Sequence, residues 1–120
     1  MTFTDHPVVY IDTRRIDDWE TFHDVFDVAF GFPSFYGRNL DAWIDCMTYL
    51  DDPEVGMSSI HAKPHSVITI KLLHAQNFKS RCAFIFDGLI EVIAFVNERR
   101  IESGEPAVLA LSYGAKGDAS

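Results

Sequence analysis

Two aspartates four residues apart, Asp41 and Asp45, stand in a segment whose pattern predicts a helix. At about 100° per residue they share one face of that helix, and Ile44 and Thr48 fall beside them. The opposite side is apolar and should face a core: Leu40, Trp43, Met47 and Leu50. Carboxylates held on an exposed helix face can bind arginine or lysine side chains through charge-assisted hydrogen bonds. The segment therefore predicts an acidic recognition surface.

An aromatic turn, Phe35-Tyr36-Gly37, leads directly into this helix. Gly37 permits a tight turn of either hand, because glycine has no Cβ. Asn39 can cap the helix by accepting a hydrogen bond from one of its unpaired backbone N–H groups. The acidic face should therefore have a well-defined start.

The residues alone leave two interpretations of the acidic pair open. Like charges at this spacing cost a few tenths of a kcal/mol in an isolated helix, so the pair does not strengthen the helix itself. It can serve a partner, or it can be two ordinary solvated acids, with Asp41 favoured by the positive first turn of the helix.

One unbroken block includes both aspartates: Pro33, Phe35, Tyr36, Gly37, Asn39, Leu40, Asp41, Ala42, Asp45, Cys46 and Thr48. This block resembles the core motif of the barstar family, the intracellular inhibitors of barnase-type ribonucleases. That motif reads roughly P-x-Y-Y-G-x-N-L-D-A-hydrophobic-hydrophobic-D-C-hydrophobic-T. The resemblance implies a barstar-like fold over nearly the whole chain and binding to a nuclease through the helix face.

The resemblance also implies roles for single residues. Phe35 would make an aromatic contact with the partner, and Asp41 and Asp45 would make the acidic ones. Ile44 and Thr48 would complete the partner-binding face. Three residues would shape the turn: Tyr36, Gly37 and Asn39.

Three departures from the family pattern concern this face. The tryptophan between the two aspartates of the inhibitor is replaced by Ile44, and the tyrosine of the turn is replaced by Phe35. A gap-free alignment puts Arg99 where the inhibitor has a glutamate, although Glu98 is adjacent and a shift of one residue would restore the acid. A changed periphery around a retained acidic pair indicates specificity for a different partner.

Charge and composition set compatible bounds. Ten Lys and Arg residues against eighteen Asp and Glu residues give a net charge of -8, which argues against direct binding to nucleic acid and favours a basic protein partner. With 120 residues, 48% of them hydrophobic, the chain is expected to form one domain, residues 1–113, followed by a disordered tail, residues 114–120.

The chain reads as cytoplasmic. It has no apolar stretch of roughly 20 residues, as a membrane span requires, and its start lacks the features of a secretory signal. Its two cysteines, Cys46 and Cys82, are expected to be buried thiols and not a disulfide. The oligomeric state stays open, because a small parallel sheet could leave an edge strand available for pairing.

An enzymatic function is not expected. Two carboxylates can serve as general acid and base, but that role needs a concave site in which their pKa values differ. The histidines outside the first helix are scattered along the chain: His6, His61, His65 and His74. The sequence has neither the residue spacing of a zinc site nor a glycine-rich phosphate loop. We therefore expect no metal and no cofactor.

Apolar strands alternate with amphipathic helices along the chain. Strands are predicted over 7–11, 66–73 and 107–111, and helices over 18–30, 40–50, 74–81 and 82–101, with a long loop over 51–66. The first strand is expected to be buried on both faces and His23 to be partly exposed. The order predicts an α/β fold, a small three-stranded parallel sheet packed with about four helices.

These observations predict a barstar-like inhibitor that inserts an acidic helix face into the basic active site of a ribonuclease. The alternative is a non-enzymatic interaction module that regulates a different, non-nuclease protein. The residues do not decide between the two, because a fold does not fix a function.

Overall fold

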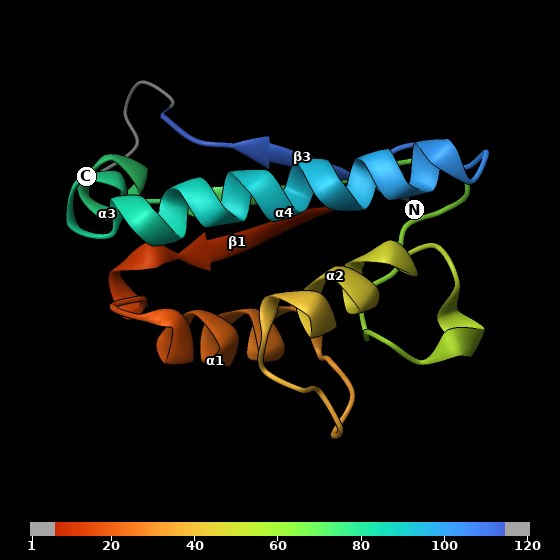
Figure 1. The fold of residues 1–120 in the computed structure, drawn as a ribbon, viewed down its shortest axis with the longest axis horizontal. Helices are drawn as coiled ribbons and strands as arrows, with labels where there is room; N and C mark the ends of the chain where they lie inside the picture. The colour runs from red at the N-terminus through yellow and green to blue at the C-terminus, as the bar shows by residue number, and fades with distance from the viewer. Residues whose placement is uncertain (1–6, 115–120) are drawn as a thin grey trace, which may run out of the picture.

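The computed structural model describes residues 7–114, in which a three-stranded parallel sheet carries helices on one face (Figure 1). The strands are β1 (Val8–Asp12), β2 (Ile68–Leu73) and β3 (Leu109–Ser112). The helices are α1 (Trp19–Phe30), α2 (Leu40–Thr48), α3 (Ala75–Arg81) and α4 (Ala83–Glu102), with short 3-10 turns η1 (Thr13–Arg15) and η2 (Pro53–Val55). The predicted α/β class is confirmed. Of the expected tail only residue 114 is described, so the expectation of disorder lies outside the described residues.

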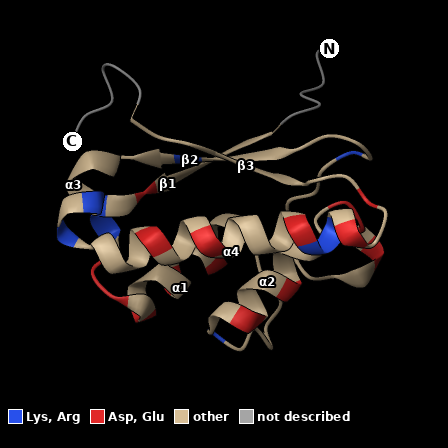
Figure 2. Cartoon of the chain, turned by 45° about the horizontal axis from the view of Figure 1, so that its top comes forward, with Lys and Arg blue, Asp and Glu red and all other residues tan. Residues whose placement is uncertain are grey.

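The sheet has the strand order β1-β2-β3, with Val9 opposite Ile70 and Ile68 opposite Leu109. Each new strand is added at the same edge of the sheet. Right-handed crossovers between such parallel strands place all the connecting helices on one face of the sheet. The helices indeed lie together on one side of the sheet (Figure 2). Within residues 7–114 no helix covers the opposite face, and the core lies between sheet and helices.

The prediction that β1 is buried on both faces is wrong. Val9 and Ile11 face the core, whereas Val8 is 45% exposed and Tyr10 64% exposed. Successive side chains of a strand point to opposite faces, and the described helices pack on only one face of this sheet. Strand β2 alternates in the same way between buried and half-buried positions.

Helix α1 begins and ends where the sequence predicts. Asp18 caps it by accepting a hydrogen bond from the Thr21 backbone N–H, and the Thr21 hydroxyl oxygen accepts one from the Asp18 backbone N–H. Gly31 ends the helix with a left-handed conformation, φ 63°. The aromatic side chains between the two ends are buried, as expected of a core stripe: Phe22, Phe26 and Phe30.

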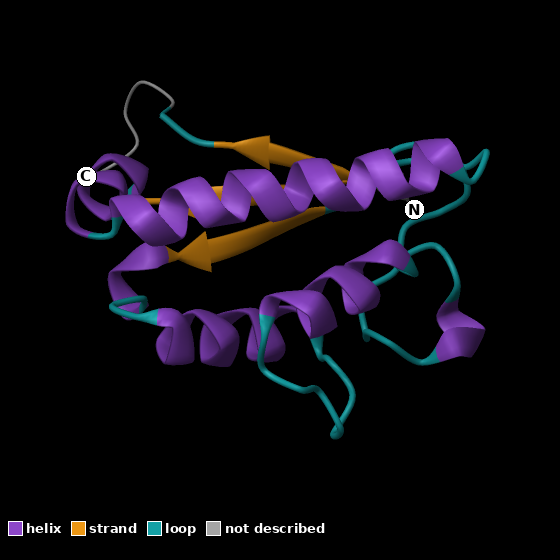
Figure 3. Ribbon diagram, viewed as in Figure 1, coloured by secondary structure: helices purple, strands orange, loops and turns teal. Residues whose placement is uncertain are grey.

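The long connection between α2 and β2 is mostly irregular, as predicted, but it is attached to the body of the protein (Figure 3). The Ser59 N–H donates to the Phe30 carbonyl at 2.8 Å, and the Ala62 N–H donates to the Leu50 carbonyl at 2.8 Å. These bonds hold the connection against the ends of α1 and α2.

Cys46 and Cys82 are both buried and unbonded, which confirms the prediction of free thiols. Within the part of the chain that is described, no helix is both long and apolar enough to cross a lipid bilayer.

Replacing Gly31 with alanine should destabilise the fold more than replacing Gly56, although both glycines have positive φ, 63° and 75°. Either alanine would cost roughly 1–2 kcal/mol from its left-handed backbone. A Cβ at Gly31 would in addition lie 2.4 Å from the Ser59 Oγ, whereas a Cβ at Gly56 would meet nothing within 4 Å. This overlap should add roughly 1–3 kcal/mol.

Urea unfolding of both variants measures the difference. Equal losses of unfolding free energy would show that Ser59 does not pack against the end of α1.

Candidate functional site

Helix α2 carries both aspartates on an exposed face, and its first turn is capped as predicted. The Asn39 Oδ1 accepts a hydrogen bond from the Ala42 N–H at 2.8 Å. Asp41 is exposed and has no ion pair with any residue in the range 7–114. Its position in the first turn places its negative charge next to the positive end of the helix dipole.

In the aromatic turn before α2, the ring of Tyr36 is buried and the ring of Phe35 is exposed to solvent. The Tyr36 N–H donates to the Pro33 carbonyl at 2.9 Å, which closes a tight turn. Tyr36 is 9% exposed and its ring centroid lies 4.6 Å from that of Phe32. Phe35 is 73% exposed. The turn therefore presents Phe35 to solvent while Tyr36 anchors it.

The left-handed residue of this segment is Arg38, with φ 57°, and the freedom that Gly37 offers is not used for a positive φ. Arg38 is stabilised there by its side chain, which donates to the Asp24 carboxylate at 2.7 Å and to the Glu20 carbonyl at 3.1 Å. Both acceptors lie on α1. Arg38 therefore fastens the turn to the first helix.

His23 is 4% exposed, so the expectation of a partly exposed residue is wrong. Its Nδ1 lies 2.5 Å from the Tyr36 hydroxyl. Burial, with a smaller contribution from Arg38, lowers the pKa of His23, and burial raises the pKa of Tyr36. Both groups are therefore neutral near pH 7, and the hydroxyl and the imidazole share a hydrogen bond between uncharged partners.

Ile44 and Thr48 are less exposed to solvent than their position beside the aspartates predicts. Each is 8% exposed, and Ile44 belongs to the core cluster. The Thr48 hydroxyl donates to the Ile44 carbonyl at 2.6 Å, within α2. Ile44 can therefore offer a partner little apolar surface, and its role in binding remains a prediction.

Asp45 is exposed but forms an ion pair across the helix interface. The Arg99 Nη1 on α4 lies 3.0 Å from the Asp45 Oδ1, and the two side chains are 43% and 52% exposed. Glu98 is exposed and forms no ion pair with another residue of the range 7–114. Of the two α4 positions left open by the alignment, it is thus Arg99 that contacts the acidic face.

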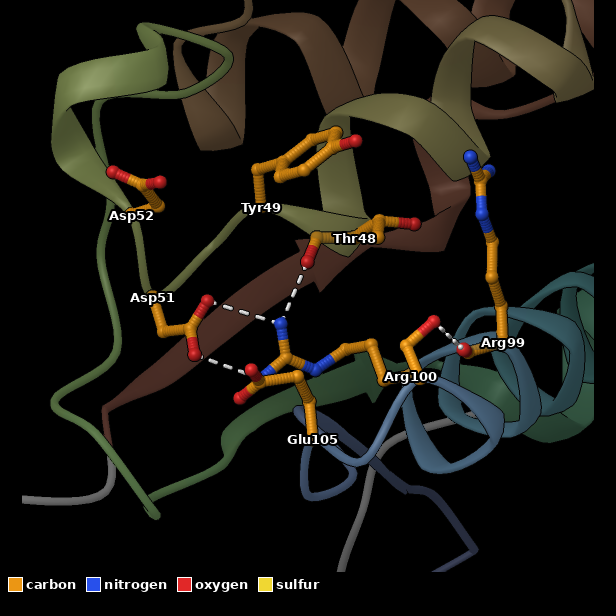
Figure 4. Close-up of a pocket in the computed structure, with 8 residues that line it drawn as sticks. Thr48, Tyr49, Asp51, Asp52, Arg99, Arg100 and Glu105 are labelled. Carbon is orange, nitrogen blue, oxygen red and sulfur yellow. Dashed lines mark hydrogen bonds and ion pairs between the residues drawn. The ribbon is translucent and has the colours of Figure 1, made fainter.

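The next arginine, Arg100, is buried and joins four segments (Figure 4). Its guanidinium forms two hydrogen bonds with the Asp51 carboxylate, at 2.7 and 3.0 Å. It also donates to the carbonyls of Thr48, at 2.7 Å, and Pro106, at 2.8 Å. The hydrogen bonds that Arg100 donates to the Asp51 carboxylate lower the pKa of Asp51. Asp51 therefore serves the fold and does not extend the acidic surface.

Tyr49 is an exposed residue next to this site that the sequence analysis did not single out. It follows Asp45 by four residues, which is the same spacing that links Asp41 to Asp45, and it is 39% exposed. With Asp52, Arg99 and other residues it lines a surface hollow of about 440 Å³ between the ends of α2 and α4. Its spacing of four residues from Asp45 is the feature of the sequence that could have predicted its place beside the acidic face.

The described residues do not place three His, Cys, Asp or Glu side chains together as a metal site would. The polar groups gathered at this site are instead carboxylates on one helix and arginines on another. Such a surface is suited to binding charged groups of another molecule.

A family model described as "Barstar (barnase inhibitor)" matches residues 6–112. The chain belongs to the barstar family. A protein of Bacillus subtilis (strain 168) named "Putative ribonuclease inhibitor YrdF" is similar to this barstar-family protein, with 45% identity over 40 residues. That segment is 33% of this chain and 44% of YrdF, so the match spans less than half of the curated relative.

Replacing Asp51 with asparagine should destabilise this barstar-family protein by about 1–3 kcal/mol at neutral pH, because Arg100 would remain buried without its counter-charge. The matched control is Asp52→Asn, an exposed neighbour, which should change stability by less than about 0.5 kcal/mol. Denaturant unfolding measures both. The difference between Asp51→Asn and the parent should begin to shrink as pH falls below 3.8, where the unfolded parent takes up a proton at Asp51 that the folded protein, with its lowered pKa, still excludes. It should be lost once the folded carboxylate is protonated too. A difference that persists at low pH would contradict an ionic role for Asp51.

Protein stability should decrease as pH falls below about 6.5. The unfolded state then binds a proton at His23 that the folded state, with its lowered pKa, does not bind. His23→Gln, which keeps a hydrogen-bonding partner for the Tyr36 hydroxyl, should weaken this pH dependence. His61→Gln, at an exposed position, should leave it unchanged. Thermal melting between pH 5 and 8 distinguishes them, and parallel curves for all three proteins would contradict the account.

Proposed function

We propose that the protein binds a barnase-type ribonuclease and inhibits it by placing the exposed face of α2 in the basic active site of the enzyme. The observation that supports this most directly is the position of Asp41 and Asp45. Both are exposed on a short helix whose start is capped and whose end is held by Arg100. A carboxylate held in place loses little conformational entropy on binding, which favours affinity.

In this mechanism the carboxylates imitate the substrate. Asp45 occupies the position of a substrate phosphate and accepts hydrogen bonds from the cationic groups that normally hold it. Asp41 adds negative potential next to it. Phe35 and Tyr49, which are both exposed aromatics, provide contact area at the border of the acidic face. Occupation of the site excludes RNA.

The charge of the whole chain suits this role. A net charge of -8 attracts a basic nuclease and increases the rate of encounter at low ionic strength. Acidic positions of α4 lie on the same side of the molecule as those of α2 (Figure 2). We place the inhibitor in the cytoplasm, where its two thiols would stay reduced.

The second candidate is an interaction module for a partner that is not a nuclease. The observation that favours it is the altered surface around Asp45, where Ile44 is buried and Arg99 already pairs with the carboxylate. Capture of partners from the source cell with the wild type and the Asp41→Ala/Asp45→Ala double variant separates the two candidates. A ribonuclease lost from the double variant supports inhibition, and loss of a non-nuclease protein supports the alternative.

Replacing Asp45 with alanine should weaken inhibition of barnase by at least roughly 30-fold, or about 2 kcal/mol, because a desolvated acidic contact is removed. RNA cleavage at increasing inhibitor concentration gives the inhibition constant. Asp87→Ala is the control, because it removes the same charge at an exposed position of α4, about 18 Å along the helix from Arg99. Equal inhibition by the wild type and Asp45→Ala would contradict the mechanism.

A further inference from the structure

Arg99 forms the contact between α4 and the acidic face of α2. Its Nη1 donates one hydrogen bond to the Asp45 Oδ1, at 3.0 Å, and both side chains are about half exposed, 43% and 52%. An exposed pair with a single hydrogen bond contributes little to stability, because water competes for both groups. This ion pair can therefore open at little cost to the fold.

The neighbouring ion pair provides the contrast. Arg100 and Asp51 share two hydrogen bonds, and the side chain of Arg100 is 6% exposed. Two backbone carbonyls complete the guanidinium contacts. Breaking this pair would leave a buried charge without a partner. Of the two adjacent arginines, only Arg99 has a contact that another molecule could replace.

Acidic and aromatic side chains are prominent on the exposed surface around Arg99. On α4 it lines a shallow hollow of about 310 Å³ together with Phe95, Glu98 and Glu102. On its other side lie Asp45 and the hollow that includes Tyr49. Arg99 is thus a positive charge set between carboxylates of two helices. A cationic partner that approaches this surface meets Arg99 as a competitor for Asp45 and as a source of repulsion.

We propose that Arg99 is a displaceable internal counter-ion of Asp45 and thereby selects the partner. The inference rests on the proposed function, since it assigns a second residue to the same surface. A guanidinium or ammonium group of the partner takes the place of Arg99 on Asp45. The released Arg99 then faces the partner. A uniformly basic surface repels it, whereas a basic surface with a carboxylate opposite Arg99 pairs with it. The preferred partner is therefore a basic protein face that includes such a carboxylate.

Binding of a hexa-arginine peptide, which has no side-chain carboxylate opposite Arg99, tests the competition directly. Arg99→Ala should bind the peptide about two- to fivefold more tightly than the wild type, the range that an exposed ion pair allows. Arg99→Glu should bind it more tightly still. The gain from Arg99→Ala should disappear in the Asp45→Ala background, because no carboxylate is then uncovered.

Arg14→Ala is the matched control. Arg14 pairs with Asp12 at 2.8 Å and is exposed, so its removal makes the same change in net charge next to an uncovered aspartate, at the end of β1. It uncovers a carboxylate that lies beside α1 and not beside Asp41, so any gain should be smaller than that of Arg99→Ala. Isothermal titration at low and physiological salt measures all six proteins: the wild type, Arg99→Ala, Arg99→Glu, Asp45→Ala, the Arg99→Ala/Asp45→Ala double variant and Arg14→Ala.

Unchanged or weaker peptide binding by Arg99→Ala would overturn the proposal, and so would a gain that persists without Asp45 or appears equally in Arg14→Ala. Barnase serves as the second probe, with the same order of variants expected for inhibition. Absence of any inhibition of barnase would count against the proposed function, while the peptide titration would still decide the role of Arg99.

Discussion

The arrangement of the site depends on one buried guanidinium. Arg100 brings a charge into the protein interior, and such a charge is tolerated only when its donors are paired. Its partners come from the end of α2, the start of the long connection and the segment before β3. The position of α2 relative to α4 is therefore set by hydrogen-bond geometry as well as by apolar packing. The exposed surface formed by the two helices together is therefore held in a fixed geometry.

The other end of the surface is held by different chemistry. Tyr36 reaches His23 inside the protein through a neutral hydrogen bond, and Arg38 reaches Asp24 on the outside through an ionic one. The turn between α1 and α2 is thus fixed from both sides, which leaves Phe35 as its projecting residue. Rigid presentation of this kind reduces the entropy that a partner must overcome.

Local patterns in the sequence were sufficient for the elements, the helix caps and the family block, because these depend on residues close together in the chain. These patterns did not predict contacts or burial that depend on residues far away in the sequence. Asp45 meets Arg99 54 residues later, and the alignment alone left that position open. The apolar strand around Tyr10 gave no sign that the helices of residues 7–114 pack on one sheet face only. The burial of His23 and Ile44 likewise depends on elements packed against them.

The division of labour between neighbouring arginines has an evolutionary consequence. Positions 99 and 100 are one codon apart, yet a substitution at Arg100 would disturb folding, whereas one at Arg99 would alter mainly the exposed surface. Mutation can therefore explore new binding preferences at Arg99 without first acquiring compensating changes in the interior. Divergence among relatives that meet different antagonists would then be concentrated at such positions, while the adjacent interior residue stays under purifying selection.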